Sequence, residues 1–140
     1  MSAKQIHLHG KTRINLIIWV IVILAVVFIN YLPIFQNGFL KTWDDNRYVL
    51  ENKYIQDFNL IKMFTKYYDG HYHPLALLSL AIDFKIGKLD PTTYHITSLV
   101  LHLINVILVF LFVYYLFKKK ELLIPVIAGL LFGISTIQVE

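Results

Sequence analysis

The sequence predicts an all-α integral membrane protein with three transmembrane helices and an outer loop that carries short interfacial helices after the first span. Composition is the first observation behind this prediction. Of the 140 residues, 57% are hydrophobic and 16% are charged, and the mean hydropathy is +0.60. Soluble domains carry about 45–50% apolar and about 25% charged residues, so the excess indicates membrane spans. The chain has no cysteine, which excludes disulfides and thiolate metal sites.

The second observation is where the charge lies. The net charge is +4, but basic residues cluster beside apolar runs, at Lys4, Lys11 and Arg13 and again at 118–120. Between residues 32 and 97, seven basic and seven acidic residues balance. Basic clusters of membrane proteins stay in the cytosol. This distribution predicts a bilayer as the partner and no nucleic acid, with the N-terminus cytosolic.

The first span is predicted at residues 14–31, after a polar cytosolic segment at 1–13. At about 1.5 Å per residue this run is roughly 27 Å long, close to a bilayer core. The alternative is a signal peptide, whose apolar part is about 7–15 residues long and precedes a small-residue cleavage site. This run is longer and ends in Asn30-Tyr31-Leu32-Pro33 without such a site. We therefore expect an uncleaved signal anchor.

Residues 32–97 form the predicted extracytoplasmic loop, with a turn at Asn37-Gly38. Asp57 or Asn59 can cap a first short helix, which Asp69-Gly70 would end. Its helical face is predicted to comprise Leu60, Ile61, Phe64, Tyr67 and Tyr68.

A second loop helix is predicted to start at Pro74 and to stop at Gly87. It is apolar but too short to cross a bilayer, so an interfacial or re-entrant helix fits it better than a soluble core helix. A turn at Asp90-Pro91 follows. The second span is then predicted at 98–117, a cytosolic loop at 118–121, a short third span at 122–137 and an extracytoplasmic end at 138–140.

Adjacent carboxylates at Asp44 and Asp45 form the first candidate for chemistry. Near a surface of low dielectric constant, two such groups can have their pKa values pushed apart, so that one serves as a base or a metal ligand. The alternative is that one of them caps a helix beginning at Asn46 or Arg47.

Histidines supply the other candidates. His71 and His73 alternate just before Pro74 and can bind a metal or an anionic substrate, or simply lie at the surface with His73 at a helix start. In the second span, polar side chains at i, i+3, i+7 and i+10 share one stripe: His95, Ser98, His102 and Asn105. Polar groups at membrane depth face a wet cavity or bond to another helix. Gly129 and Gly133 form a G-x-x-x-G that permits close helix packing.

An ordered set of short motifs resembles the first lumenal loop of polytopic, C-type glycosyltransferases. The most similar members are the membrane O-mannosyltransferases with tetratricopeptide repeats and their bacterial relatives. The resemblance covers residues 37–134. It rests on Asn37-Gly38-Phe39, Trp43-Asp44-Asp45, Tyr48, Asn52, Ile55, His73-Pro74-Leu75, Leu78-Ser79, Asp90-Pro91, Tyr94-His95 and Leu101-His102.

The resemblance implies transfer of a sugar from a polyprenyl-phosphate donor to an acceptor, in the bacterial inner membrane or the endoplasmic reticulum. Asp44 matches the acid that serves as base in that family, and Asp45 would orient or tune it. Arg47, His71 and His73 are candidates for binding the donor phosphate. Of these, only His73 lies in a matched motif, and Arg47 and His71 are added because of their charge and proximity. His102 also lies in a matched motif and is a candidate for binding the donor or the acceptor. No cofactor is predicted, although a divalent metal is compatible with such chemistry.

The chain departs from the family in two ways. Relatives have a His-Pro-x-His-x-Glu-like run after the third span, whereas residues 135–140 keep only Glu140. Relatives also have several times as many spans, together with repeats. We therefore expect the N-terminal part of a larger enzyme, completed by further transmembrane helices of the same or another chain. The alternative is a non-catalytic membrane interaction subunit or a truncated relic.

Overall fold

The computed structural model describes residues 3–40, 44–118 and 121–135, with side chains from Ile14 onward. Over these residues the chain is helical, and the only β pairing is an isolated bridge between Tyr68 and His71. The chain divides into two compact units, each of which is described by itself. Unit 1 comprises residues 1–32 and 98–140, and unit 2 comprises residues 33–97.

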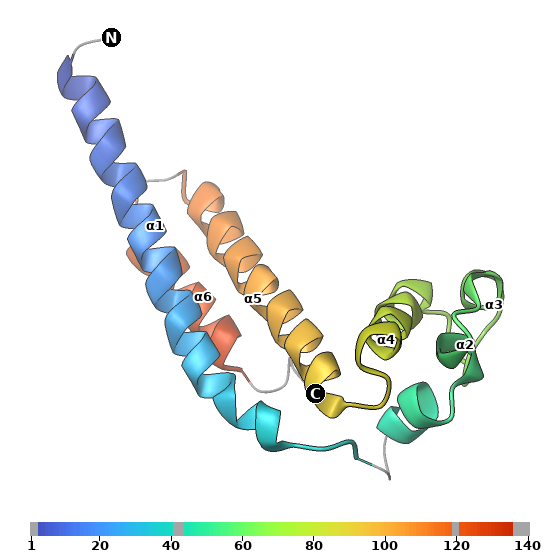
Figure 1. The fold of residues 1–140 in the computed structure, drawn as a ribbon. Helices are drawn as coiled ribbons and strands as arrows, with labels where there is room; N and C mark the ends of the chain where they lie inside the picture. Colours follow the sequence, from blue (N-terminus) through green and yellow to red (C-terminus); the bar gives the residue numbers. More distant parts are fainter. Residues whose placement is uncertain (1–2, 41–43, 119–120, 136–140) are drawn as a thin grey trace. The chain divides into compact units, whose positions relative to one another are not determined.

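Unit 1 is built from three helices (Figure 1). α1 spans Ala3–Tyr31 and continues into the short 3-10 helix η1 at Leu32–Gln36, α5 spans Pro91–Leu116 and α6 spans Leu123–Ile134. The segment Ile14–Gln36 and α5 are long and apolar enough to cross a bilayer, whereas α6 is shorter. Only 17% and 22% of their most apolar windows are buried, whereas a core helix of a soluble protein would be mostly buried. The two helices therefore indicate a membrane protein.

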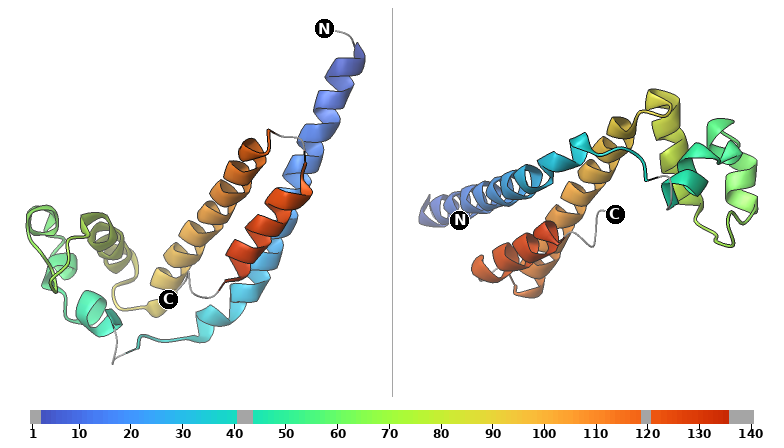
Figure 2. Two further views of the ribbon diagram at one scale, coloured as in Figure 1. Left: turned by 180° about the vertical axis from the view of Figure 1, so that it is seen from behind. Right: turned by 90° about the horizontal axis from the view of Figure 1, so that it is seen from below.

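α6 packs in unit 1 through its two buried glycines, and Figure 2 shows it alongside the other two helices. A Cβ atom added at Gly129 would lie 3.5 Å from Ile23 Cδ1 of α1 and 3.6 Å from Phe110 Cβ of α5. At Gly133 it would collide with Val27 of α1. The prediction that the G-x-x-x-G permits close packing is confirmed, since a side chain at Gly133 would force α6 away from α1.

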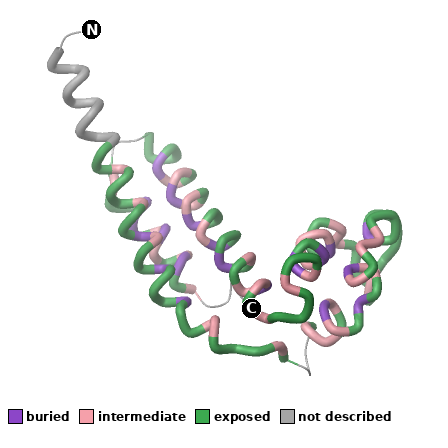
Figure 3. The backbone as a smooth tube through the Cα atoms, in the orientation of Figure 1, coloured by how far each residue is buried: buried purple, intermediate pink, exposed green. Residues whose placement is uncertain are grey.

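Unit 2 consists of short helices around a small core. They are the π-helix η2 at Asn46–Leu50, α2 at Lys53–Gln56, α3 at Leu60–Thr65 and α4 at Pro74–Gly87, followed by the first residues of α5. The buried apolar side chains come from all of these elements (Figure 3): Val49, Ile55, Met63, Leu77, Ala81 and Tyr94.

Several helix ends in unit 2 lie where the sequence predicts them, but α3 ends at Thr65, before the predicted end at Asp69-Gly70. The Asn59 side chain accepts a hydrogen bond from the Lys62 amide at 3.1 Å, so Asn59 and not Asp57 caps α3. α4 begins at Pro74 and ends at Gly87, as predicted. Gly87 is required there because a Cβ atom would collide with Thr93. The positive φ that stops the helix, 54°, falls on Lys88 instead.

The predicted apolar face of α3 is wrong. α3 ends at Thr65, so the two tyrosines that follow lie outside it. Leu60 and Ile61 are exposed, and the buried residue is Met63. Tyr68 instead pairs with His71 across a tight turn in which Asp69 and Gly70 have φ values of 49° and 79°. Two consecutive positive φ values are typical of hairpin turns. The helix ends before this turn, because the backbone is already extended at Lys66 (φ −120°, ψ 151°).

The helix that contains the predicted second span is longer than that span. The helix begins at Pro91, seven residues before Ser98, and the predicted turn is its N-terminus. Pro91 is suited to a first helical position, where no N–H is needed. The Asp90 carboxylate accepts a hydrogen bond from the Thr92 amide at 3.1 Å. α1 likewise begins earlier than the predicted span, since the helix already includes residues 3–13.

Candidate functional site

The two adjacent carboxylates of unit 2 are in different environments. Asp45 Oδ2 accepts a hydrogen bond from the Leu40 amide at 2.8 Å. Asp45 stands at the N-cap position of η2, but its side chain makes no capping bond there. Asp44 is exposed and bonds to no residue that the structure describes. The pair therefore contains one carboxylate that bonds the loop at Leu40 and one that is exposed and makes no bond among the described residues.

Arg47 faces a second acidic group across the unit. Its Nη1 lies 3.0 Å from Asp69 Oδ2, and both side chains are partly exposed. The hydrogen bond and charge of Asp69 raise the pKa of Arg47, and the charge of Asp44 adds to this. The Tyr68 hydroxyl donates to the Arg47 carbonyl oxygen at 2.7 Å. These bonds hold η2 against the turn at residues 68–71.

Aromatic rings connect Arg47 to the histidines. The Tyr48 ring lies 5.1 Å from the His73 ring and 5.5 Å from the Tyr68 ring, between centroids. His71 and His73 are 6.0 Å apart by the same measure. Burial raises the pKa of the Tyr48 phenol, and the charges of Asp69 and Asp44 raise it further. A tyrosine is already neutral at pH 7, since its ordinary pKa is about 10, and this rise keeps the Tyr48 phenol protonated to still higher pH.

Several predicted site residues thus lie together in unit 2, and with two neighbouring side chains, Tyr48 and Asp69, they form what we name the η2 cluster: Asp44, Arg47, Tyr48, Asp69, His71 and His73. It offers an accessible carboxylate, a guanidinium and two imidazoles, which suits proton transfer from an acceptor and binding of an anion. Within the described part of the chain, no three His, Asp or Glu side chains converge as metal ligands would.

The polar stripe of α5 separates into different environments. His102 is buried, and its Nε2 lies 3.0 Å from the Gly133 carbonyl oxygen of α6. Its ring also meets those of Tyr31 and Phe132, at 5.2 and 5.7 Å between centroids. In unit 1, His102 therefore serves interhelical bonding, the structural alternative for this stripe.

The other members of the stripe do not share that environment. His95 belongs to unit 2, where its Nε2 lies 3.1 Å from the Asn37 carbonyl oxygen. Ser98 and Asn105 are exposed on α5. The remaining predicted site residue, Glu140, lies outside the described residues, as does Trp43.

Two buried polar side chains of unit 2 were not predicted. Asp83 in α4 is 3% exposed, and its Oδ1 accepts a hydrogen bond from the Thr97 hydroxyl at 2.6 Å. Burial raises the pKa of Asp83, and the bond from Thr97 partly offsets this. Asn52 is fully buried, caps α2 through Tyr54 N, and leaves its Nδ2 without a partner among the described residues. A lone acid in an otherwise apolar helix was the available signal for Asp83.

Comparison of the chain with models of protein families, with curated proteins and with solved structures finds no match. A functional interpretation therefore rests on the chemistry and placement of the residues themselves, and on the motifs quoted above.

Proposed function

We propose that this chain forms the N-terminal part of a polytopic C-type glycosyltransferase that moves a sugar from a polyprenyl-phosphate donor to an acceptor. In the proposed topology, α1, α5 and the third apolar segment cross the membrane, the N-terminus is cytosolic and unit 2 is extracytoplasmic. The observation that carries the proposal is the asymmetry of the acidic pair. Asp45 is engaged by Leu40 N, whereas Asp44 is exposed, bonds to no residue that the structure describes, and acts through its charge on Arg47 and Tyr48.

Asp44 acts in this proposal as the general base. Its carboxylate takes the proton of the acceptor nucleophile as the new bond to the anomeric carbon forms. The bond between that carbon and the phosphate oxygen breaks on the opposite face, so the configuration inverts. The electron pair leaves with the polyprenyl phosphate. Asp45 holds the loop that presents Asp44.

Arg47, His71 and His73 are the proposed contacts for the donor phosphate. Guanidinium and imidazolium groups are suited to phosphate oxygens. Arg47 is already paired with Asp69 at 3.0 Å, so the arriving phosphate would compete with that carboxylate. Because the pair is largely exposed, its separation costs little.

The test uses membranes that contain the complete polypeptide to which this chain belongs, with a radiolabelled polyprenyl-phosphate sugar. Asp44→Asn should lower transfer by about 100-fold or more, since the base is removed with little change in shape. Asp45→Asn is the matched control and should lose less, because it acts through the loop. Transfer by Asp44→Asn at the unmodified rate would refute the base assignment.

A non-catalytic membrane interaction subunit is the second candidate, and the exposure of Ser98 and Asn105 favours it. Polar side chains on a candidate span are costly against lipid and are satisfied by a neighbouring helix. His102 is not available for this, because it bonds within unit 1. Under this alternative, Asn105→Leu releases a co-purifying membrane partner. A chain that is monomeric in detergent with or without Asn105→Leu would exclude it.

A further inference from the structure

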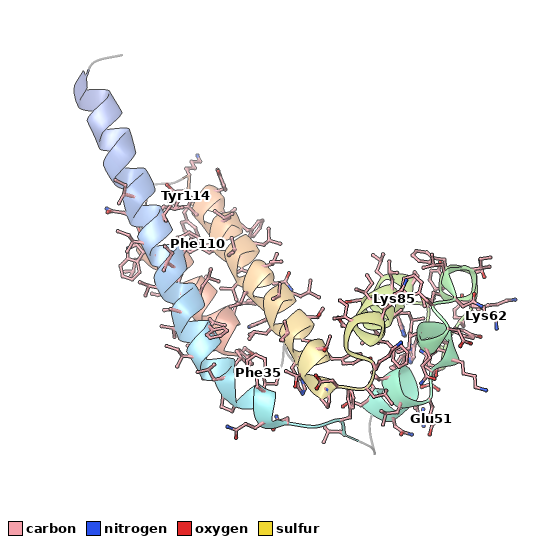
Figure 4. The ribbon with its side chains drawn as sticks, viewed as in Figure 1. Phe35, Glu51, Lys62, Lys85, Phe110 and Tyr114 are labelled. Carbon is pink, nitrogen blue, oxygen red and sulfur yellow. The ribbon has the colours of Figure 1, made fainter. Side chains whose placement is uncertain are left out.

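Within unit 1, α5 carries two separate stripes of side chains. One stripe is buried and includes Phe110, which is labelled in Figure 4: Leu99, His102, Val106 and Phe110. The other stripe is exposed, and we name it the α5 seam: Ser98, Leu101, Asn105, Leu108 and Phe112. Its successive members are three, four, three and four residues apart. This alternation is the repeat by which one helix packs along a second helix.

Asn105 is the member of the α5 seam that lipid covers poorly. It is exposed and bonds to no residue that the structure describes. A carboxamide without a partner is costly in hydrocarbon, whereas the segment of α1 from Leu16 to Ile29 is hydrophobic throughout. His102 is the other strongly polar side chain of this part of α5, and it is already bonded to the Gly133 carbonyl oxygen. A helix with its own polar group therefore suits the seam better than lipid does.

The chemistry of the seam fits a second copy of the same chain. Copies that insert by the same charge rule have the same orientation, so their α5 helices run parallel. In a parallel pair with two-fold symmetry, each seam residue faces its own equivalent. Asn105 then faces Asn105, and a carboxamide has both N–H donors and an acceptor oxygen. The Ser98 hydroxyl is self-complementary in the same way, and Leu101 and Leu108 form apolar layers between the polar ones.

We propose that α5 pairs in parallel with α5 of a second copy through the α5 seam. Asn105 bonds across the pair and fixes its register, as a single asparagine does in other paired helices. A helix of different sequence would have to supply a matching group at each of these depths, whereas a second copy supplies them by symmetry. The pairing does not rest on sugar transfer, which the Asp44 variants test separately.

The chain has no cysteine, so single cysteines report which faces meet. Leu101→Cys and Val100→Cys are made in the full chain and oxidised with copper phenanthroline in the membranes of the expressing cells. The two positions are neighbours and are 50% and 49% exposed, but only Leu101 belongs to the α5 seam. We expect several-fold more disulfide-linked dimer from Leu101→Cys. Equal yields would show random collision, and no dimer from Leu101→Cys would show that no second copy lies there. Either result overturns the proposal.

Asn105→Leu in the Leu101→Cys background tests the bond across the pair in vesicles of graded lipid-to-protein ratio. The ratio at which half of the chain is cross-linked should fall by about 5- to 30-fold, the factor that one interhelical hydrogen bond supplies between model peptides. Asn105→Gln keeps the donor and acceptor groups and should restore most of the dimer. Unchanged Trp19 emission in a Trp43→Phe background shows that unit 1 stays folded. Cross-linking that Asn105→Leu leaves unaltered would overturn the assigned register.

Discussion

In unit 1 two glycines let α6 approach α1 closely, whereas in unit 2 aromatic rings surround a small, mainly aliphatic core. Gly129 and Gly133 of α6 face Ile23 and Val27 of α1. The core of unit 2 is instead surrounded by partly buried rings: Phe39, Tyr48, Tyr54, Phe58, Tyr68 and Phe84. Long helices can approach closely over many turns, so small residues are useful at their contacts. Short helices meet over a single turn, so each contact needs a larger side chain.

The two units also differ in how the backbone groups at their helix ends find hydrogen-bond partners. A long helix bonds most of its backbone internally, whereas a helix of four to six residues leaves nearly all of its end groups without intrahelical partners. Unit 2 satisfies two of these, the Tyr54 and Lys62 amides, with the side chains of Asn52 and Asn59. Unit 1 satisfies the end of α6 with His102 and with Tyr31, whose hydroxyl donates to the Ser135 carbonyl oxygen at 2.8 Å. We therefore expect side-chain deletions to weaken unit 2 more than unit 1.

The largest effect is expected from Leu77→Ala, which removes a fully buried side chain from the core of unit 2. It should lower the free energy of unfolding of unit 2 by about 2–5 kcal/mol. Near-UV circular dichroism of the clustered tyrosines during denaturant titration in detergent measures this. Leu75→Ala, on the exposed face of the same helix, should change stability by less than about 0.5 kcal/mol. Equal losses for the two variants would contradict the assignment of the α4 faces.

Gly133→Val is expected to damage unit 1 next. The added side chain collides with Val27, so α6 must move away from α1, at a cost of about 1–3 kcal/mol. Trp19 fluorescence in a Trp43→Phe background reports unfolding of α1. Gly129→Ala is the matched control and should be tolerated better, because its Cβ atom would meet ordinary contact distances of 3.5 Å and more. If Gly129→Ala destabilised unit 1 more than Gly133→Val, the described packing of α6 against α1 would be wrong.

Capping and helix-breaking residues in the sequence correctly predicted several helix ends. Pro74 and Gly87 bound α4 as predicted, and Asn59 caps α3. Periodicity failed where the helix was shorter than the pattern. The apolar spacing from Leu60 to Tyr68 continues past Thr65, but the backbone is extended at Lys66, so Tyr68 lies outside the helix. The start of α5 was missed because hydropathy marks where a span becomes apolar, not where its helix is capped.

The composition of the η2 cluster could be predicted only in part. Asp44, Arg47, His71 and His73 were identified from the chemistry of their side chains and from the motifs around them. The partner of Arg47 was not, because Asp69 lies 22 residues away and its approach depends on the hairpin turn. The different environments of Asp44 and Asp45 could not be predicted from the sequence either. It depends on the path of the backbone back to Leu40.

A smaller effect is expected from His102→Phe, which keeps a ring beside Tyr31 and Phe132 but removes the bond to Gly133 O. Interhelical hydrogen bonds in membranes contribute about 0.6 kcal/mol on average, so the loss from unit 1 should be about 1 kcal/mol or less. Trp19 fluorescence in detergent measures it. Asn105→Leu, one turn along the same helix and exposed, should not destabilise unit 1. If Asn105→Leu proved the more damaging change, the stripe would be oriented differently from the structure.

The smallest expected effect is the pH dependence that Asp83 confers on unit 2. Because burial raises the pKa of Asp83 in the folded state, folding favours its protonated form. Its contribution to stability is therefore complete below the ordinary aspartate pKa of about 4 and is lost as the pH rises through the folded-state pKa. The effect is small because the bond from Thr97 stabilises the carboxylate.

Asp83→Asn keeps an oxygen that can accept the Thr97 bond and removes the titration. Denaturant titrations followed by tyrosine circular dichroism should show that the unmodified chain loses stability between pH 4 and pH 8 relative to Asp83→Asn. Asp57→Asn, at an exposed carboxylate, should retain the pH dependence of the unmodified chain. If the unmodified chain instead gained stability relative to Asp83→Asn over this range, Asp83 would be held as a stabilised carboxylate. Unit 2 would then have to supply a cation or a further hydrogen-bond donor to the Asp83 carboxylate. A buried carboxylate held charged in this way would indicate a functional role for Asp83, because packing alone does not require a charge.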